Sequence, residues 1–171
     1  MMNYKVVFES ERICFVNIHK ELADEYVRMV NDPEVSRYIT LRDRFFTYDD
    51  EVKWIEDKLK DQHVIFSMIE KETGRFIGNI ELLEINNNVG ELGICITPAM
   101  QNKHYGSEAI PRFMKYCSEE LGLENIELSV FSHNERAIAL YQKLGFTEYK
   151  RDVNVGTYHG IRIDDICMKL K

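Results

Sequence analysis

The stretch at residues 90–110, GELGICITPAMQNKHYGSEAI, constrains the fold more than any other part of the chain. A short apolar run ends at Pro98, and a polar loop then leads through Gly106 into a sequence with helical spacing. A strand followed closely by a helix leaves several backbone N–H groups unpaired beside the positive end of the helix dipole, and such an end binds anions. Lys103 lies in the loop, where its charge can meet a phosphate. An ordinary strand-to-helix turn looks the same, so this stretch alone leaves both interpretations open.

A second motif, NERAIALYQKLGF at residues 134–146, directly follows another strand-like run. Together the two stretches contain Q-x-x-x-x-G-[ST]-E-A and then N-x-x-A-x-x-L-Y-x-K-x-G-F, an order and spacing that resemble the GNAT superfamily of acetyl-CoA-dependent N-acetyltransferases. The chain is most similar to the branch with the ribosomal-protein alanine N-acetyltransferases and the spermidine acetyltransferases, whose early NDPEV segment matches residues 31–35. The likeness covers essentially the whole chain and is strongest over residues 76–146.

The resemblance implies a mixed α/β fold, the acyl-CoA N-acyltransferase fold, in which a central twisted mixed sheet of about seven strands is flanked by about four helices. A chain of 171 residues is long enough to bury a substantial core. We therefore expect a single N-acetyltransferase domain over residues 1–171.

Runs of alternating and β-branched residues predict the strands of this sheet. The three middle runs before the polar loop should form an antiparallel meander, the run after the following helix should lie parallel to the last of them, and the final two runs should form a hairpin. The expected strands are at residues 13–18, 63–69, 75–85, 89–96, 126–130, 146–153 and 161–170.

Apolar residues at helical spacing predict four helices. The first, at 21–30, should end at Asp32 and Pro33, and the second should begin at a capping box made by Thr47 and Asp50. The third is expected at 107–121 and the fourth in the second motif, up to Gly145. Buried faces are expected to include Val52, Ile55 and Leu59 in the second helix and Ile110, Phe113, Met114, Cys117 and Leu121 in the third.

Composition excludes several classes of protein. A net charge of −7 and a pI near 5.3 argue against a nucleic-acid-binding protein and suit a cationic substrate, although many proteins are acidic for solubility alone. No apolar run approaches the length of a membrane span, so we expect a cytoplasmic protein with no membrane partner. The four cysteines are far apart and no histidine lies at ligand spacing, which indicates reduced thiols and no metal site.

The family resemblance assigns acetyl-CoA as the cofactor and a set of residues that would hold it. The pantetheine arm would lie along Ile94, Cys95 and Ile96, and a backbone N–H near Ile94 or Cys95 would bond the acetyl carbonyl. The pyrophosphate would take backbone N–H groups of the loop, although the family usually has glycine where this chain has His104. The expected loop residues are Gln101, Asn102, Lys103, His104, Tyr105, Gly106 and Ser107, and the second motif adds Asn134, Ala137, Tyr141 and Lys143. Asn134 is equally a favoured helix N-cap whatever the function.

Two residues are candidates for proton transfer. Tyr141 matches the family's general acid, which protonates the departing thiolate, although without its motif it would be interpreted as a core aromatic residue. Glu91 matches a carboxylate position in spermidine acetyltransferases and would accept the amine proton through water or attract a cation, while a solvent-facing strand carboxylate is the alternative. Glu81 and Glu84 are weaker candidates. Cys95 as a nucleophile is disfavoured, because the sequence places no base beside it.

By the same resemblance, the first two helices would form one wall of the acceptor cleft, with substrate-side candidates between them: Tyr38, Arg42, Arg44, Phe45 and Phe46. Each is also compatible with a plain surface loop. The leading function is acetyl transfer to an amine, which is a protein N-terminal α-amine, a polyamine or another small amine. A catalytically idle coenzyme A-binding protein and a purely structural domain are the alternatives. The oligomeric state, a monomer or a homodimer, stays open.

Overall fold

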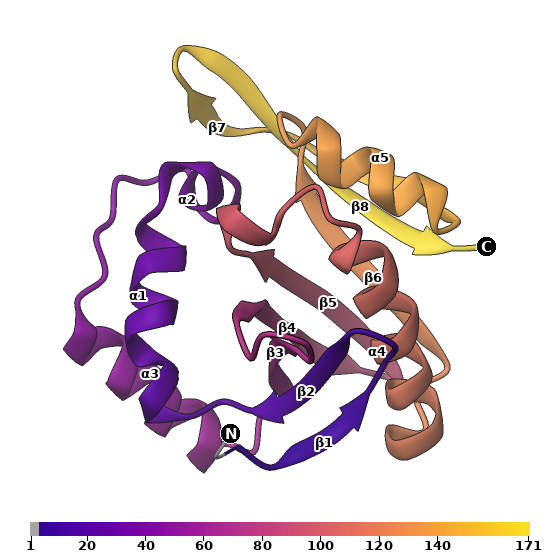
Figure 1. Ribbon diagram of the computed structural model, residues 1–171. Coiled ribbons are helices and arrows are strands. Elements are labelled where there is room, and N and C mark those ends of the chain that lie inside the picture. The colour runs from indigo at the N-terminus through magenta and orange to yellow at the C-terminus, as the bar shows by residue number, and fades with distance from the viewer. Residues whose placement is uncertain (1–3) are drawn as a thin grey trace.

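The structure is a computed structural model that describes residues 4–171, in which one eight-stranded sheet is flanked by five α-helices and two short 3₁₀ helices (Figure 1). The strands are β1 (Val6–Glu9), β2 (Ile13–Asn17), β3 (Ile65–Glu70), β4 (Phe76–Asn86), β5 (Val89–Ile96), β6 (Asn125–Phe131), β7 (Phe146–Tyr158) and β8 (Ile161–Leu170). The helices are η1 (Lys20–Leu22), α1 (Ala23–Asn31), α2 (Pro33–Ile39), α3 (Tyr48–Lys60), η2 (Pro98–Met100), α4 (Tyr105–Leu121) and α5 (Glu135–Lys143).

The strands lie in the order β1-β2-β3-β4-β5-β6-β8-β7, and β5 and β6 are the parallel pair between two antiparallel blocks. This confirms the expected antiparallel meander of β3, β4 and β5, the parallel β6 and the closing β7–β8 hairpin. The polar loop therefore follows the C-terminal end of β5, beside the one parallel junction of the sheet, which is where ligands of open α/β sheets bind.

Each face of the sheet carries its own apolar core. On one face, called the α1–α3 face, Tyr26 of α1 and Ile55 of α3 pack on strand residues such as Val16 and Phe76. On the other, called the α4–α5 face, the core contains Phe113 of α4, Tyr141 of α5 and strand residues Ile80, Leu92 and Ile166. Alternation along β5 follows this division, because Leu92 belongs to the α4–α5 core while Cys95 packs against the α1–α3 core.

Two elements were not expected from the sequence. β1 is a short edge strand in which Phe8 alone is buried, so it lacks the repeated alternation that predicts a strand. α2 begins where a helix was expected only to end: the Asp32 side chain caps it by accepting from Glu34 N at 2.9 Å, and Pro33 takes the first helical position. Proline there loses no hydrogen bond, so the same two residues end α1 and start α2.

Some expected boundaries and faces were wrong. α4 begins at Tyr105, two residues before the expected start, and β7 extends to Tyr158 rather than to residue 153. Leu59 is 52% exposed and Leu121 38% exposed, so neither lies on a buried helix face. Glu51 is the buried residue of α3 that the pattern missed. The capping box is confirmed, since Asp50 N donates to Thr47 Oγ1 and Thr47 N donates to Asp50 Oδ2.

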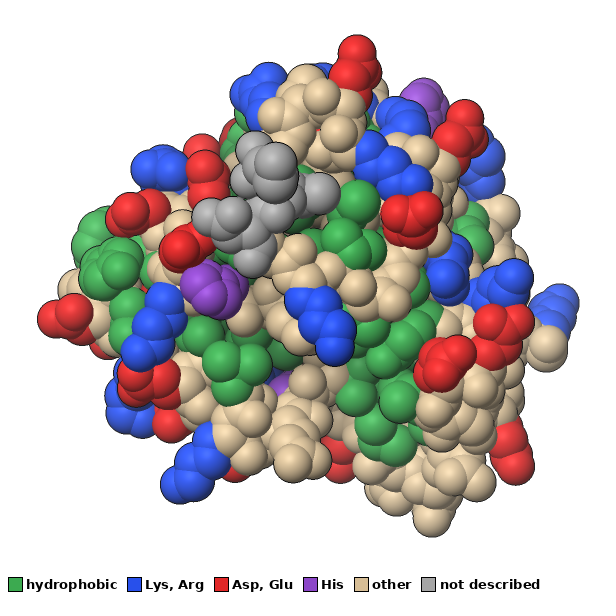
Figure 2. Space-filling view, turned by 60° about the horizontal axis from the view of Figure 1, so that its bottom comes forward, with side chains coloured by type: hydrophobic (Ala, Val, Ile, Leu, Met, Phe, Trp, Pro, Cys, Tyr) green, Lys and Arg blue, Asp and Glu red, His purple; other side chains and the backbone are tan. Residues whose placement is uncertain are grey.

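The surface carries mixed charges. Figure 2 shows acidic and basic side chains interspersed, with hydrophobic side chains between them, over the face that it views. No helix in residues 4–171 is long and apolar enough to cross a membrane. Within the same residues, no group of three or more potential ligand side chains is arranged to hold a metal ion.

Candidate functional site

The central feature of the site is a fork between β5 and β6. These strands pair from Val89 and Asn125 to Leu92 and Leu128, and there the pairing stops. β5 continues to Ile96 with β4 as its one described neighbour, and β6 continues with β8. Backbone groups on one edge of residues 94–96 are therefore left without a strand partner among the residues described. Such an edge accepts an extended chain through strand-like hydrogen bonds.

The loop after β5 presents backbone donors. At the start of α4, the N–H groups of Tyr105, Gly106 and Ser107 have no hydrogen-bond acceptor among residues 4–171. His104, the N-cap residue, is in the left-handed conformation with φ 64° and ψ 20°, and it makes no side-chain cap. A left-handed residue followed by helical residues turns successive N–H groups into one concavity, which binds anions. The loop is thus shaped for a phosphate group.

The conformation of His104 gives a physical reason for the glycine that the family usually has there. Glycine populates positive φ without the strain that a Cβ introduces. The imidazole of His104 is exposed, so the backbone takes the required shape with the side chain directed into solvent. Asn102, with φ 60°, is left-handed as well, a conformation that asparagine tolerates better than most residues.

Side chains from the strands β2 and β3 and their flanking turns hold the loop and the first turn of α4. Arg12 Nη1 donates to the carbonyl oxygen of Lys103 at 3.0 Å, and its Nε pairs with Glu108 at 2.7 Å. The same guanidinium lies 4.3 Å from the centre of the Tyr105 ring, whose hydroxyl bonds Glu70. Arg12 was not predicted from the sequence, because it lies about ninety residues before the loop.

α5 contributes a second cation that the sequence analysis missed. Arg136 Nη2 donates to Gln101 Oε1 at 2.5 Å, and Nη1 donates to Asn102 Oδ1 at 3.4 Å. Lys103, also in the loop, forms no ion pair with a described carboxylate. Two positive charges therefore lie beside the unpaired N–H groups. The available signal was the position of Arg136 between Asn134 and Ala137, inside the second motif.

Gly106 has a packing role. A Cβ at this position would lie 2.9 Å from Leu140 Cδ2 and 3.6 Å from Ile96 Cδ1. The glycine therefore lets α4 approach α5 and the end of β5 closely. This helix contact gives the glycine a packing role, and the close approach to a ligand that the sequence predicts stays a prediction.

Tyr141 lies one residue beyond Leu140 and is 8% exposed, with its ring edge-on to Phe146 at 6.2 Å between centroids. Burial raises the pKa of its hydroxyl far above the ordinary value, and the nearby Cys95 thiol adds to this. Burial also raises the pKa of Cys95 to about 12, with Glu81 contributing. Tyr141 thus keeps its proton at neutral pH, and Cys95 stays a neutral thiol rather than a nucleophile.

The remaining residues of the second motif have plainer surroundings. Asn134 caps α5, because its Oδ1 accepts from Ala137 N at 3.3 Å, so its Nδ2 remains for another partner. Lys143 is exposed in the last turn of α5 and forms no hydrogen bond or ion pair with any described residue.

Glu91 lies on the α1–α3 face, like Cys95, because residues an even number of positions apart on a strand share a face and these two are four apart. Glu91 is half-buried. Burial is the main cause that raises the pKa of its carboxyl, and the charge of Glu84 raises this pKa further. A hydrogen bond with Ser129 lowers it. Three residues of strand separate it from Ile94, a span of about 10 Å. This backbone separation favours a water relay or a field effect over direct contact between the Glu91 carboxylate and an amine at Ile94. Glu81 forms an ion pair with Lys58, with 3.2 Å between Oε2 and Nζ.

The segment between α1 and α3 is tied to the other side of the fork. The ring of Tyr38 lies 5.1 Å from that of His133, whose Nε2 donates to the carbonyl oxygen of Arg37 at 2.7 Å. A Cβ at Gly156 of β7 would lie 2.7 Å from Leu41 Cδ1. These contacts place Tyr38 at the join between α2 and the β6–α5 connection.

The other residues of this segment lie further out. Asn31 clamps Phe46 by accepting from its N–H at 2.9 Å and donating to its carbonyl at 2.7 Å. The guanidinium carbon of Arg44 lies 4.5 Å from the centre of the Phe46 ring. Phe45 is 74% exposed, and Arg42 is exposed too.

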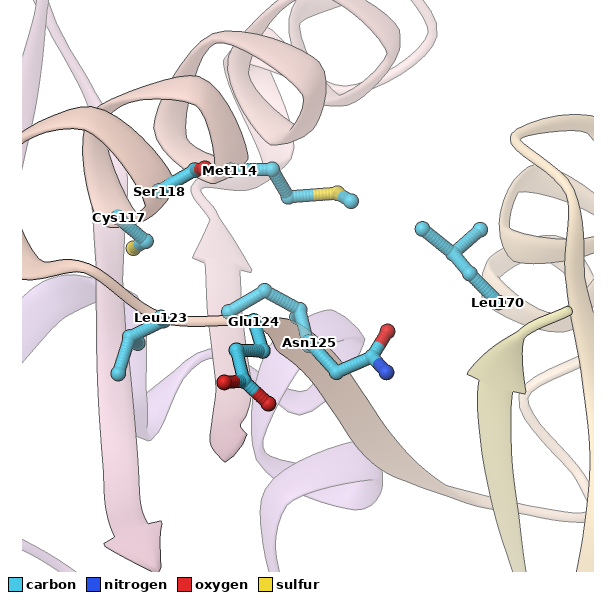
Figure 3. Close-up of a pocket in the computed structure, with 8 residues that line it drawn as sticks. Met114, Cys117, Ser118, Leu123, Glu124, Asn125 and Leu170 are labelled. Atoms are coloured by element: carbon cyan, nitrogen blue, oxygen red, sulfur yellow. The ribbon is translucent and has the colours of Figure 1, made fainter. Parts of the chain in front are cut away.

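A separate small pocket of about 100 Å³ lies between the C-terminal half of α4, the start of β6 and the end of β8 (Figure 3). Asn125, which lines it, pairs with Val89 at the start of β5. The pocket is therefore at the end of β5 away from the loop and does not belong to the site at the fork.

Comparison with known proteins supplies an independent line of argument. Residues 12–147 match the family model described as acetyltransferase (GNAT) domain. The chain is 30% identical over 144 residues to the uncharacterized N-acetyltransferase p20 of Bacillus licheniformis. This alignment covers 80% of each of the two proteins. The chain is 35% identical over 83 residues to the spermidine N(1)-acetyltransferase of Vibrio cholerae. This alignment covers 47% of this chain and 48% of the relative.

Solved structures agree on the fold. The crystal structure of spermidine N-acetyltransferase from Vibrio cholerae in complex with CoA and spermine superposes with a TM-score of 0.82 over 93% of this chain and 95% of that one, at 22% identity. The match extends over nearly the whole chain, so the two proteins share their fold.

Proposed function

Because this chain belongs to the GNAT family and is an acetyl-CoA-dependent acetyltransferase, we propose that it transfers the acetyl group to a primary amine, which attacks directly in a ternary complex. The observation that carries the proposal is the fork beyond Leu92 and Leu128. It has a free strand edge along β5 and unpaired N–H groups at the start of α4. A direct attack is favoured over a covalent enzyme intermediate because the Cys95 thiol is held neutral.

The residues at the fork fit acetyl-CoA. The free edge of residues 94–96 suits the amide-bearing pantetheine arm, and the N–H groups of Tyr105, Gly106 and Ser107 suit a pyrophosphate. Arg136 and Lys103 add positive charge at the same place. When bound, acetyl-CoA supplies an activated acyl group with a thiolate as its leaving group.

Three groups of this chain then act on charge and protons. A backbone N–H at Ile94 or Cys95 donates to the carbonyl oxygen as negative charge develops on it. The hydroxyl of Tyr141 donates its proton to the departing sulfur, a transfer that its raised pKa opposes and that its position beside the sulfur must assist. Glu91 receives the proton of the amine through water, because three residues of strand, about 10 Å, separate its backbone from Ile94.

The charge of the α1–α3 face favours a small cationic amine as the acceptor. Glu84, Glu91 and Asp165 form no ion pair with a described cation, and burial raises the pKa values of Glu91 and Asp165. An ammonium group nearby would relieve this uncompensated charge. The relatives named as spermidine acetyltransferases support a small amine more than a protein N-terminus.

The alternative, a catalytically idle coenzyme A-binding protein, rested on His104. The left-handed backbone of this residue keeps the loop shape that glycine would give, with the imidazole exposed. No other feature of the fork favours the idle protein.

The test is release of coenzyme A from acetyl-CoA in the presence of a panel of primary amines, together with calorimetry of acetyl-CoA binding. Arg136→Ala should weaken acetyl-CoA binding about tenfold, the worth of a charge-assisted hydrogen bond. Lys115→Ala, which removes an exposed positive charge from the far side of α4, is the matched control and should bind as the wild type does. Absence of coenzyme A release with every amine would contradict the proposal.

A further inference from the structure

A chain of buried hydrogen bonds crosses the α1–α3 face and ends beside the fork. Ser67 Oγ donates to Asn79 Oδ1 at 2.7 Å, and the hydroxyls of Tyr26 and Ser67 are 2.5 Å apart. Since the single hydroxyl proton of Ser67 is committed to Asn79, Tyr26 donates to Ser67. Burial raises the pKa of Tyr26 to about 12, so it remains a donor at neutral pH. The N–H of His19 completes the chain by donating to the Tyr26 hydroxyl at 3.4 Å.

This chain fixes the direction of the Asn79 amide. In the sheet, Asn79 lies between Ser67 of β3 and Cys95 of β5, and its side chain shares the α1–α3 face with both. Its Oδ1 is turned toward β3, where Ser67 donates to it. The nitrogen of a planar amide points away from its oxygen, so Nδ2 is directed away from Ser67, on the side of Asn79 where β5 pairs with β4.

Asn79 is only 9% exposed, and its Nδ2 donates no hydrogen bond to any of residues 4–171. Nδ2 is not among the side-chain atoms sealed from solvent without a partner, so this donor is open to a ligand. A ligand that covers this donor must supply an acceptor, because a donor left unpaired once it is cut off from water costs free energy. Directly opposed strand residues have Cβ atoms about 5 Å apart, so this donor lies over the part of β5 whose other edge is free at the fork. The Nδ2 group of Asn79 is therefore placed to donate a hydrogen bond to a ligand bound at the fork.

We propose that Asn79 is a specificity-determining residue, whose Nδ2 donates a hydrogen bond to an oxygen carried by the acceptor amine. The preferred acceptor is then a primary amine with a carbonyl or hydroxyl oxygen on the carbon next to the amine-bearing one, such as an amino-acid amide or a 2-amino sugar. This inference rests on the proposed function, and it narrows the class of amine.

Simple alkylamines and polyamines fit this arrangement less well. Their chains carry N–H donors and CH₂ groups and no oxygen, so a bound polyamine would cover Nδ2 without giving it an acceptor. A site built to bond a polar substrate group discriminates strongly against an analogue that lacks the group, because the donor of the protein is then left unpaired. The acidic residues near Glu91 attract the ammonium group of either class of amine and do not separate them.

The test compares matched pairs of amines: glycinamide with propylamine, and glucosamine with cyclohexylamine. For each pair the ratio of kcat/KM values is measured in the wild type and in Asn79→Leu, a change of similar size that removes the donor. Comparing ratios between the two proteins cancels the different basicities of the amines. The expected result is a fall of about tenfold in the ratio of at least one pair, through a loss on the oxygen-bearing amine. Which pair responds identifies a carbonyl or a hydroxyl as the bonded group.

Two further variants keep the test interpretable. Ser67→Ala releases the Asn79 amide while leaving it in place, and it should lower the same ratio even if Asn79→Leu folds poorly. Asn125→Leu removes an exposed amide at the far end of β6 and should leave the ratio unchanged. Calorimetric affinity for the oxygen-bearing amine should fall in parallel with the ratio.

Two results would overturn the inference. Ratios that are equal in the wild type, Asn79→Leu and Ser67→Ala, whether or not both amines of a pair lose activity together, would show that the chain of hydrogen bonds serves packing alone. Failure of the wild type to acetylate any amine would overturn the proposed function and this inference with it, whereas activity with unchanged ratios would overturn the inference alone.

Discussion

Leu92 of β5 and Leu128 of β6 form the last backbone pair between these strands, and beyond that pair the strands separate. Backbone N–H and C=O groups inside a sheet need partners, and separation removes one set of them along residues 94–96. The parallel pair is held together below the fork by the α4–α5 core, which contains both leucines. The Ile96 carbonyl accepts from Gln101 Nε2 at 2.9 Å, and the proposed amide-bearing arm would bond the remaining groups of this edge.

Replacing His104 with glycine should make the protein more stable. His104 has a φ of 64°, and the left-handed conformation costs a residue with a Cβ about 1 kcal/mol or more of free energy. Chemical denaturation of His104→Gly should show a gain of that order, and calorimetry should show acetyl-CoA affinity that is unchanged or improved. A large loss of affinity would instead mean that the imidazole contacts the ligand.

Gly106→Val should lower both stability and acetyl-CoA affinity, because its side chain would collide with Leu140 and move α5 away from α4. Overpacking of this kind costs about 1–3 kcal/mol. The double variant with Leu140→Ala makes room for the new side chain, so its midpoint of unfolding should recover part of the loss. If the single variant keeps full stability and loses affinity alone, Gly106 serves the ligand rather than the helix contact.

Glu51 should make the protein less stable as pH rises. Its side chain is 5% exposed without an ion-pair partner, and burial, with Asp50 contributing, raises its pKa to about 7. The folded protein therefore holds this proton after the unfolded chain has lost it, so stability falls between about pH 4.3 and 7, by an amount on the order of 3 kcal/mol.

Glu51→Gln should remove this pH dependence. Urea unfolding at pH 5 and pH 8 should show the variant close to the wild type at the lower pH and more stable at the higher one. Glu72→Gln, at an exposed turn residue, is the control and should follow the wild type at both. Equal effects of Glu51→Gln at the two pH values would contradict the account.

The sequence predicted the sheet order around β5 and the two motif regions because hydrophobic periodicity and capping residues are local signals. It missed α2, since Asp32 and Pro33 are both a stop signal and a start signal, and local spacing does not show which one applies. The expected start of α4 was late for a similar reason: the left-handed His104 begins the helix without a capping side chain.

The candidate site was predictable where a motif carried it and hidden where it depends on tertiary contacts. Tyr141 and the loop residues were found from the motifs. Arg12 reaches the loop from the start of β2, and Arg136 reaches it from α5. Asn79 gave no signal at all, because its orientation is set by Ser67 and Tyr26, which are far apart in the chain. The point at which β5 and β6 separate is likewise a property of pairing and not of composition.

The central claim is that Tyr141 is the general acid of an acetyl transfer at the fork. Tyr141→Phe keeps the ring and its packing on Phe146 and removes the hydroxyl alone. The decisive measurement is kcat of this variant on an accepted amine under conditions where chemistry limits turnover, with acetyl-CoA affinity measured in parallel. A fall of about 10²- to 10⁴-fold in kcat with unchanged affinity is the predicted result. A kcat close to that of the wild type would contradict the claim and assign the proton to water or another group.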